Sequence, residues 1–280
     1  MTKRFDRSRK TFADYYLTMF GPIKHLFQDT YNADDDVNLL LLGETGVGKS
    51  TLVNSISNYF KYASFKEAQK RIIDILIPMY STESRKVYGI ADENEDYDEG
   101  KCTTQFVKEY MFPIKMNNRT FNLRLIDTPG VGDPRGMEQD EINLDNVLAY
   151  LTTLKKLHGI CFVLKSNQTG FTKFAEYCLK QILTRLDKSA SQNIIFITTY
   201  SKTESYTAGE TKSHCLAPLV KDIMSTPPHA NIPLSDDNVF CLDNEAFKAL
   251  LASQDGKRYT KREVKGFETS WQVSSNEIQR

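Results

Sequence analysis

The stretch Gly43-Glu44-Thr45-Gly46-Val47-Gly48-Lys49-Ser50 satisfies the pattern GxxxxGK[ST], where x is any residue. The apolar run 37–42 precedes it, as expected for a strand buried on both faces of a parallel sheet, and a helical pattern begins near residue 49. Glycines in such a turn let backbone N–H groups point at phosphate oxygens, and the start of the helix favours an anion. The stretch therefore predicts a phosphate-binding loop.

Each residue type in this loop has a chemical reason to be there. Lys49 is expected to reach the β- and γ-phosphates of a nucleoside triphosphate, and the Ser50 hydroxyl is expected to bind Mg²⁺. A glycine-rich turn that serves packing alone would not need lysine followed by serine. Further nucleotide contacts are predicted for the neighbouring residues Glu44, Thr45, Gly46, Val47, Gly48 and Thr51.

A second motif, Asp127-Thr128-Pro129-Gly130, follows the strand-like run 121–126. A carboxylate at the tip of a strand beside the loop can hold a Mg²⁺-bound water, and the Gly130 N–H can donate to the γ-phosphate. Alone, such a tetrapeptide usually starts a turn. Its place at the end of a strand favours Asp127 as a metal residue and Gly130 as a γ-phosphate contact.

Between these motifs, the run 92–99 carries six carboxylates in eight residues and is expected to be a mobile, solvated loop. The stretch 100–105 follows it and precedes a strand. A threonine in this place could close over Mg²⁺ and the γ-phosphate, and we choose Thr104, with Thr103 as the second choice. The alternative is an ordinary threonine where a loop enters a strand.

The composition excludes several classes of protein. The chain has 280 residues, 40% of them hydrophobic, and 36 acidic residues balance 36 basic ones, so nothing in the total charge indicates nucleic-acid binding. The five cysteines form no CxxC pair, and the histidines have no metal-site spacing. Since no signal peptide and no run of about 18 apolar residues is present, we expect a soluble cytosolic or nuclear protein.

Apolar runs and helical patterns alternate along the chain, which predicts a three-layer α/β domain with a mostly parallel sheet. Residues 1–35 are read as a helical extension, 36–256 as the main domain, and 257–280 as a tail from a longer chain. Strands are expected at 37–42, 85–91, 104–112, 120–127, 158–165, 192–199 and 238–242. Helices are expected at 49–62, 65–78, 138–157, 171–187, 210–225 and 243–254.

The order GETGVGKS, CTTQ, DTPGVGD resembles the septin-like branch of the P-loop GTPases, which includes septins, immunity-associated GTPases and chloroplast-import receptors. A set of eukaryotic G-domain proteins is more similar still. Its motifs correspond here to DTPG-x-GD-x-RG, Tyr177-Cys178, 193–196, 243–247 and Ser270-Trp271. The resemblance implies a G domain over 36–256, Mg²⁺ as cofactor, binding of GTP or GDP, and a nucleotide-dependent homodimer.

One departure from this resemblance concerns the base. The guanine-reading motif [NT]KxD is absent after the strand that ends at residue 199, so the choice between GTP and ATP stays open. Loss of the carboxylate would reduce discrimination against ATP by about 10- to 150-fold. Lys202 could stack over the base and Asn244 could contact it. A helix N-cap is an equally good structural role for Asn244.

The other departure concerns catalysis. Val131 follows the DTPG motif where a water-orienting glutamine stands in small GTPases, so slow hydrolysis is expected from Lys49, Thr104 and Gly130. A group from a dimer partner, or Arg135 in cis, could supply what is missing. Arg135 could equally form a surface ion pair with Asp133 or Glu138. A nucleotide-gated interaction module and an ATPase of similar fold are the alternatives to a GTPase.

Overall fold

The computed structural model describes residues 36–81, 86–95, 104–116, 119–132, 135–154, 156–166, 170–185 and 188–279. The predicted helical extension at 1–35 lies outside the described residues. Within the described part of the chain, none of the helices combines the length and the apolar character needed to cross a bilayer.

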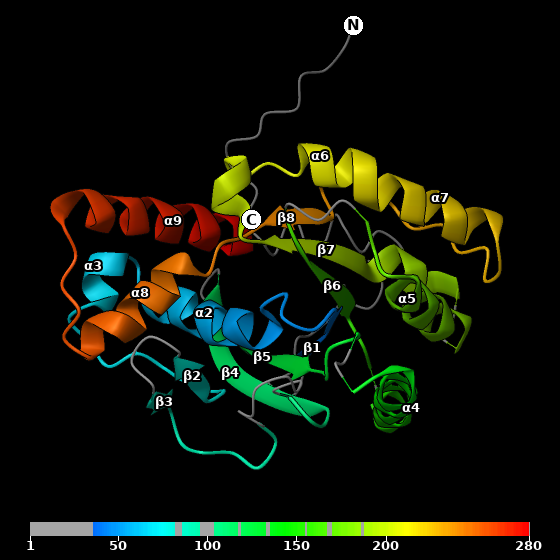
Figure 1. The fold of residues 1–280 in the computed structure, drawn as a ribbon, viewed down its shortest axis with the longest axis horizontal. Helices are drawn as coiled ribbons and strands as arrows, with labels where there is room; N and C mark the ends of the chain where they lie inside the picture. The colour runs from blue at the N-terminus through cyan, green and yellow to red at the C-terminus, as the bar shows by residue number, and fades with distance from the viewer. Residues whose placement is uncertain are drawn as a thin grey trace, which may run out of the picture.

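A six-stranded sheet in the order β4-β5-β1-β6-β7-β8 forms the centre of the molecule (Figure 1). All neighbours are parallel except β4 and β5, which form an antiparallel hairpin at one edge. The predicted mostly parallel sheet is therefore confirmed. The strands are β1 (Val37–Gly43), β4 (Lys108–Met116), β5 (Arg119–Asp127), β6 (Gly159–Lys165), β7 (Ile194–Thr199) and β8 (Val239–Cys241).

Helices cover both faces of this sheet and complete the three layers (Figure 1). One face carries α2 (Lys49–Lys61), α3 (Phe65–Ala68), α8 (Glu245–Gln254) and α9 (Lys261–Gln279). The other carries α4 (Met137–Thr153), α5 (Lys173–Arg185) and α7 (Ala217–Ser225). Shorter turns are the 3-10 helices Lys188–Asn193 and Ser201–Glu204, α6 (Gly209–Thr211) and the π-helical turn Lys212–Leu216.

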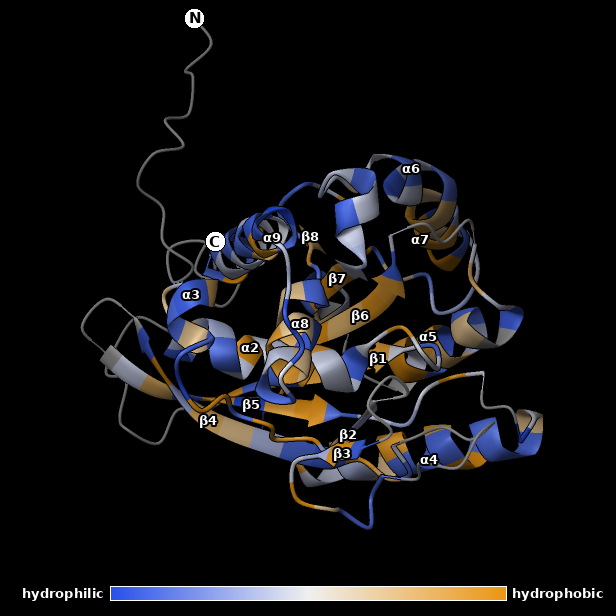
Figure 2. Cartoon of the chain, turned by 60° about the vertical axis from the view of Figure 1, so that its left-hand side comes forward, coloured by the Kyte–Doolittle hydropathy of each residue, from blue (hydrophilic) through white to orange (hydrophobic). Residues whose placement is uncertain are grey.

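Strand β1 shows why the sheet is covered twice. Its side chains alternate between two hydrophobic cores, with Leu39 and Leu41 in one and Leu40 and Leu42 in the other. A strand buried on both faces must be apolar throughout, which explains the continuous apolar run in the sequence. In Figure 2, β6 and the second part of β5 are coloured hydrophobic, whereas α4 and α9 carry many hydrophilic residues.

The topology determines where a ligand can bind. The chain leaves β1 toward β5 on one side and later places β6 on the other side of β1. In an open α/β sheet, the crevice beyond the carboxyl ends of the strands at such a reversal is the binding position. The loops after β1, β5, β7 and β8 therefore meet at one edge, and they contain most of the predicted site residues.

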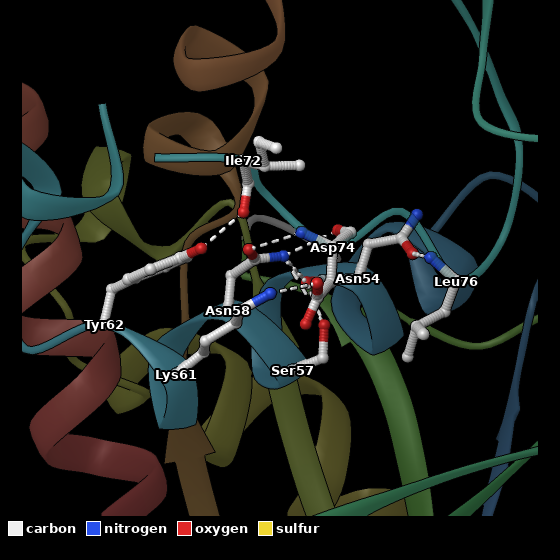
Figure 3. A network of polar contacts seen from close by, with 8 residues as sticks. All are labelled: Asn54, Ser57, Asn58, Lys61, Tyr62, Ile72, Asp74 and Leu76. Atoms are coloured by element: carbon white, nitrogen blue, oxygen red, sulfur yellow. Dashed lines mark hydrogen bonds and ion pairs between the residues drawn. The ribbon is translucent and has the colours of Figure 1, made fainter. Parts of the chain in front are cut away.

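The predicted helix at 65–78 is wrong after its first turn, because α3 ends at Ala68. The backbone that follows is bonded to side chains of α2 instead (Figure 3). Asn54 accepts from the N–H groups of Leu76 and Ile77 at 2.7 and 2.9 Å and donates to the carbonyl of Ile77 at 2.8 Å. A chain bonded in this way cannot also make helical hydrogen bonds.

Other boundaries differ by a few residues. The strand expected at 85–91 is reduced to β3 (Lys86–Tyr88), which pairs with the unpredicted β2 (Met79–Ser81) in a small separate sheet. The strand expected at 104–112 begins at Lys108. The region read as a tail contains α9, which packs against α2, α3 and α8. The division between residues 256 and 257 stays a prediction.

Candidate functional site

The loop after β1 turns through glycines in the left-handed region, with φ of 78° at Gly46 and 93° at Gly48. Helix α2 begins at Lys49, and none of the described side chains caps its N-terminus. The first helical N–H groups and the helix dipole are therefore directed into the loop without a protein carboxylate to satisfy them. This is the arrangement that binds phosphate.

Lys49 is held at the centre of the loop. Its side chain is buried, and its Nζ donates to the carbonyl oxygens of Gly43 at 3.0 Å and Glu44 at 3.3 Å. The ammonium therefore lies across the turn, close to where the loop amides converge. A positive charge in this position can neutralise phosphate oxygens at low cost, because it is already ordered.

The predicted metal residues come together from three segments. The Ser50 hydroxyl donates to Asp127 Oδ2 at 2.8 Å and lies 3.1 Å from Thr104 Oγ1. Thr104 Oγ1 donates to the same carboxylate oxygen at 3.5 Å. Hydroxyl and carboxylate oxygens are the ligands that Mg²⁺ prefers, so these residues fit the ion that the motifs imply. Thr103 lies outside the described residues.

Asp127 has no access to solvent, and burial raises the pKa of its carboxyl, while the nearby Lys49 charge acts in the opposite direction. Sequence analysis did not predict the second carboxyl in this region, Glu95. Its exposed fraction is 7%, and burial, with a further contribution from the Asp127 charge, raises its pKa to about 8. A bound cation would oppose both pKa shifts, because a nearby positive charge favours the ionised form of a carboxyl group.

The expectation of a solvated loop is wrong for Asn94 and Glu95, which are buried, whereas Glu93 is exposed. Asn94 is buried and holds Phe106, accepting from its N–H at 2.7 Å and donating to its carbonyl at 3.1 Å. Asp92 forms an ion pair with Lys108 on β4. These contacts anchor the run beside Thr104. Residues 96–99 lie outside the described residues.

The DTPG segment lies directly on the phosphate-binding loop. Thr45 N donates to Val131 O at 2.7 Å, and Val131 N donates to Gly43 O at 3.1 Å. A Cβ placed on Gly130 would lie 2.5 Å from Thr45 Oγ1. The position of Gly130 is thus coupled to the loop that would hold phosphate. The half-buried Val131 packs against one of the cores and offers no polar group to a water.

The proposed base-contacting residues come from two segments, Lys202 from the 3-10 helix after β7 and Asn244 from the start of α8. Asn244 Nδ2 donates to Gly48 O at 3.5 Å, next to the phosphate-binding loop. Asn244 occupies the N-cap position of α8 without a capping side-chain bond; Asp243 Oδ1 instead accepts from Glu245 N at 2.7 Å. The Lys202 ammonium pairs with Glu245 at 2.5 Å and is therefore directed toward α8.

Arg135 is exposed, and its Nη1 donates to Gln105 Oε1 at 3.1 Å. This contact links the segment after the DTPG motif with the segment after Thr104. Its proposed partner Asp133 lies outside the described residues. The remaining predicted contacts, Thr51 and Val47, lie in the first turn of α2 and in the loop, where Val47 O accepts from Thr199 Oγ1 at 2.7 Å.

Three buried side-chain atoms in this region have no hydrogen-bond partner among the described residues: Thr45 Oγ1, Glu95 Oε1 and Asn244 Oδ1. Buried polar atoms in native proteins are nearly always paired, so atoms left unpaired together indicate a place for a ligand. One belongs to the phosphate-binding loop, one lies beside the metal residues, and one lies near the expected base.

Comparison with known proteins agrees with this geometry. Residues 34–156, somewhat less than half of the chain, match the septin family model. This segment therefore resembles the septin-like P-loop GTPases. It contains the phosphate-binding loop, Thr104 and the DTPG motif, so the resemblance read from those motifs is confirmed.

A protein of Dictyostelium discoideum described as GTP-binding protein A is 28% identical over 167 residues, which is 60% of this chain. The chain spans only 28% of the length of that relative. Among solved structures, Toc33 from Arabidopsis thaliana in complex with Mg²⁺ and GMPPNP is 13% identical, with a TM-score of 0.43 over 95% of this chain and 93% of that one. A dimerization-deficient Toc33 mutant is 15% identical, with a TM-score of 0.44 over 82% and 78%.

Proposed function

We propose that this septin-like domain binds Mg²⁺ and a guanine nucleotide, GTP or GDP, and hydrolyses GTP slowly as a nucleotide-controlled switch or assembly module. The observation that carries the proposal is the convergence of Lys49, Ser50, Thr104 and Asp127 around an uncapped helix N-terminus. The description of the Dictyostelium relative as a GTP-binding protein supports guanine as the base.

The chain's own residues account for each part of the chemistry. Lys49 and the N–H groups of residues 45–50 would bind the triphosphate and offset the charge that develops on it during transfer to water. Ser50, Asp127 and Thr104 would hold Mg²⁺, which when bound neutralises phosphate oxygens. The Gly130 N–H would donate to the γ-phosphate, so that its loop reports whether that phosphate is present.

Base recognition is proposed for Asn244. Its Oδ1 is buried without a partner and can accept from the N–H groups on the Watson–Crick edge of guanine, which adenine presents differently. This would replace part of the discrimination that the absent [NT]KxD aspartate supplies elsewhere. Competition of ATP against GTP for the same site decides between the two bases.

The decisive experiment replaces the loop lysine. Lys49→Ala should weaken binding of a fluorescent GTP analogue by about 100-fold, because charged hydrogen bonds to phosphate are worth about 3 kcal/mol. Lys61→Ala, at the exposed end of the same helix, is the matched control and should bind normally. Equal affinity of Lys49→Ala and the control would refute the proposal, provided that circular dichroism shows both variants folded.

A second function is favoured by one observation, the apolar Val131 in the place of a water-orienting side chain. It is a nucleotide-gated dimerisation module in which hydrolysis is incidental. Phosphate release measured against protein concentration, with mass followed by light scattering, separates the two. A turnover per molecule that rises as dimers form indicates a catalytic group supplied across the interface. Dimers that form with GTP but release no phosphate indicate the module.

A further inference from the structure

Glu95 is placed beside the metal residues by the backbone and not by a long flexible side chain. Glu95 and Thr104 form an isolated antiparallel bridge, and Gln105 N donates to the carbonyl of Asn94 at 2.9 Å. Asn94 in turn holds Phe106 with both ends of its amide. The segments on either side of the undescribed residues 96–103 are therefore fastened to each other where Glu95 meets the site.

The surroundings of Glu95 carry an excess of negative charge. Its Oε2 lies 3.5 Å from Thr104 Oγ1, which also lies 3.5 Å from Asp127 Oδ2, so the single hydroxyl proton of Thr104 can be donated to only one of these carboxyl groups at a time. Lys49 is the cation next to Asp127, whereas Lys108 is engaged by Asp92. Glu95 Oε1 is buried and meets no donor among the described residues. Ionising both buried carboxyl groups beside one ammonium is costly unless another cation is bound.

The oxygen atoms are spaced as neighbouring ligands of one ion would be. Adjacent ligands of octahedral Mg²⁺ at about 2.1 Å lie roughly 3.0 Å apart. The contacts within this set measure 2.8, 3.1, 3.5 and 3.5 Å, and they join two carboxylates through two hydroxyls. No group of three or more His, Cys, Asp or Glu residues in the described chain could hold a metal by acidic and imidazole ligands alone. A metal site at this place must therefore include the hydroxyl oxygens of Ser50 and Thr104.

We propose that Glu95 supplies a second carboxylate ligand to the divalent-cation site, so that the protein binds Mg²⁺ or Mn²⁺ before a nucleotide arrives. The inference rests on the proposed function only in that Ser50, Thr104 and Asp127 serve the same ion. Its consequence is that cation binding further stabilises the contact of residues 92–95 with 104–106. Residues 92–95 then form one wall of the nucleotide site.

The test uses the nucleotide-free protein of residues 1–280 and Mn²⁺ alone, and electron paramagnetic resonance measures the free ion. Wild type should bind one Mn²⁺, and Glu95→Gln should bind it at least about 10-fold more weakly. Glutamine keeps the shape and the acceptor toward Thr104 but loses the charge. Glu93→Gln is the matched control, because Glu93 is exposed two residues away and should bind as wild type does.

Thermal unfolding gives a second readout that guards against a misfolded variant. In EDTA, Glu95→Gln should be at least as stable as wild type, because a neutral amide replaces a buried carboxyl group whose charged form is costly. Added Mg²⁺ should raise the melting temperature of wild type and Glu93→Gln much more than that of Glu95→Gln. If Glu95 had only a structural role, Glu95→Gln would be less stable than wild type in EDTA, and Mg²⁺ would raise the melting temperature of both proteins by the same amount.

The outcomes distinguish this inference from the proposed function. Equal Mn²⁺ affinity in wild type and Glu95→Gln overturns the role of Glu95, as does absence of Mn²⁺ binding to nucleotide-free wild type. If the fluorescent GTP analogue still binds with unchanged Mg²⁺ dependence in that case, the nucleotide function stands. If no nucleotide binds but Glu95→Gln loses Mn²⁺, the cation site stands and the nucleotide function fails.

Discussion

Gly130 of the DTPG segment lies directly against Thr45 of the phosphate-binding loop. A Cβ on Gly130 would lie 2.5 Å from Thr45 Oγ1, 2.6 Å from its Cα and 2.8 Å from its N. Two of these atoms belong to the backbone of the phosphate-binding loop and cannot rotate away. Any side chain at residue 130 must therefore displace one of the two loops, which is how a change near a γ-phosphate could be transmitted between them.

We expect Gly130→Ala to destabilise the protein by about 1–3 kcal/mol through overpacking and to weaken binding of the GTP analogue. Urea unfolding and a fluorescence titration measure the two effects. Gly170→Ala is the control, because a Cβ there meets nothing within 4 Å. Its stability should stay within about 0.5 kcal/mol of wild type. If the two variants have the same stability and the same affinity for the GTP analogue, a side chain at residue 130 can be accommodated without disturbing the phosphate-binding loop.

Single residues also show where sequence reasoning stops. The phosphate-binding loop is predictable because its chemistry is local: glycines, lysine and serine at fixed spacing. Glu95 is not, because it stands among six carboxylates that look alike in sequence. Only the tertiary contacts of Asn94 with Phe106 distinguish it from Glu93, which is exposed. Asn94 is the sequence feature that marks this contact, but asparagine is common in turns and loops, so it does not by itself predict that Glu95 is buried.

Among the elements, α2 does more than present the phosphate-binding loop. Asn54 and Asn58, one turn apart on its buried side, bond the backbone of residues 74–77 as a neighbouring strand would (Figure 3). Asn58 accepts from Asp74 N at 2.9 Å and donates to its carbonyl at 2.7 Å. The irregular segment is thus a fixed part of the domain, because its polar groups are paired.

Asn54→Ala is expected to cost about 2–4 kcal/mol, because it leaves the N–H groups of Leu76 and Ile77 and one carbonyl without their partner. Urea unfolding measures the total loss in the free energy of unfolding. Hydrogen exchange should show that the amides of residues 76 and 77 lose protection. Asn276→Ala, on the exposed side of α9, is the control and should change little. Unchanged exchange at 76 and 77 in Asn54→Ala would mean that another group holds this segment.

The same contacts explain why element boundaries were partly misjudged. The apolar residues of 65–78 have a helix-like spacing, and nothing local reveals asparagines some twenty positions earlier that capture the backbone. Helix α9 was missed for a different reason. Its buried side includes Ser270, Ser274 and Ser275 beside Phe267 and Trp271, so the apolar pattern is diluted by small polar residues. Tertiary context overrides local pattern in both cases.

For the whole molecule, the sheet separates two cores that share every interior strand. The core on the side of α2 is closed by α9, whose Trp271 is 1% exposed. Its ring meets Tyr59 of α2 edge to face, with centroids 4.7 Å apart, and Phe65 of α3 at 6.3 Å. Tyr59 also donates to the carbonyl of Asp243, next to the proposed base-contacting Asn244. Tyr59 therefore contacts both α9 and the turn that carries Asn244.

Trp271→Ala tests whether residues 257–280 are a tail or part of the domain. If α9 folds with the domain, the cavity left by the indole should cost about 3–5 kcal/mol and lower the midpoint of one cooperative transition. Circular dichroism must follow it, because Trp271 is the single tryptophan. Gln272→Ala, at the adjacent exposed position, should leave the midpoint unchanged. A separate early transition that involves only part of the helical signal, with the main midpoint preserved, would instead assign α9 to a tail. Because Tyr59 links the indole to the turn that carries Asn244, an integral α9 further requires weaker nucleotide binding in Trp271→Ala than in the control.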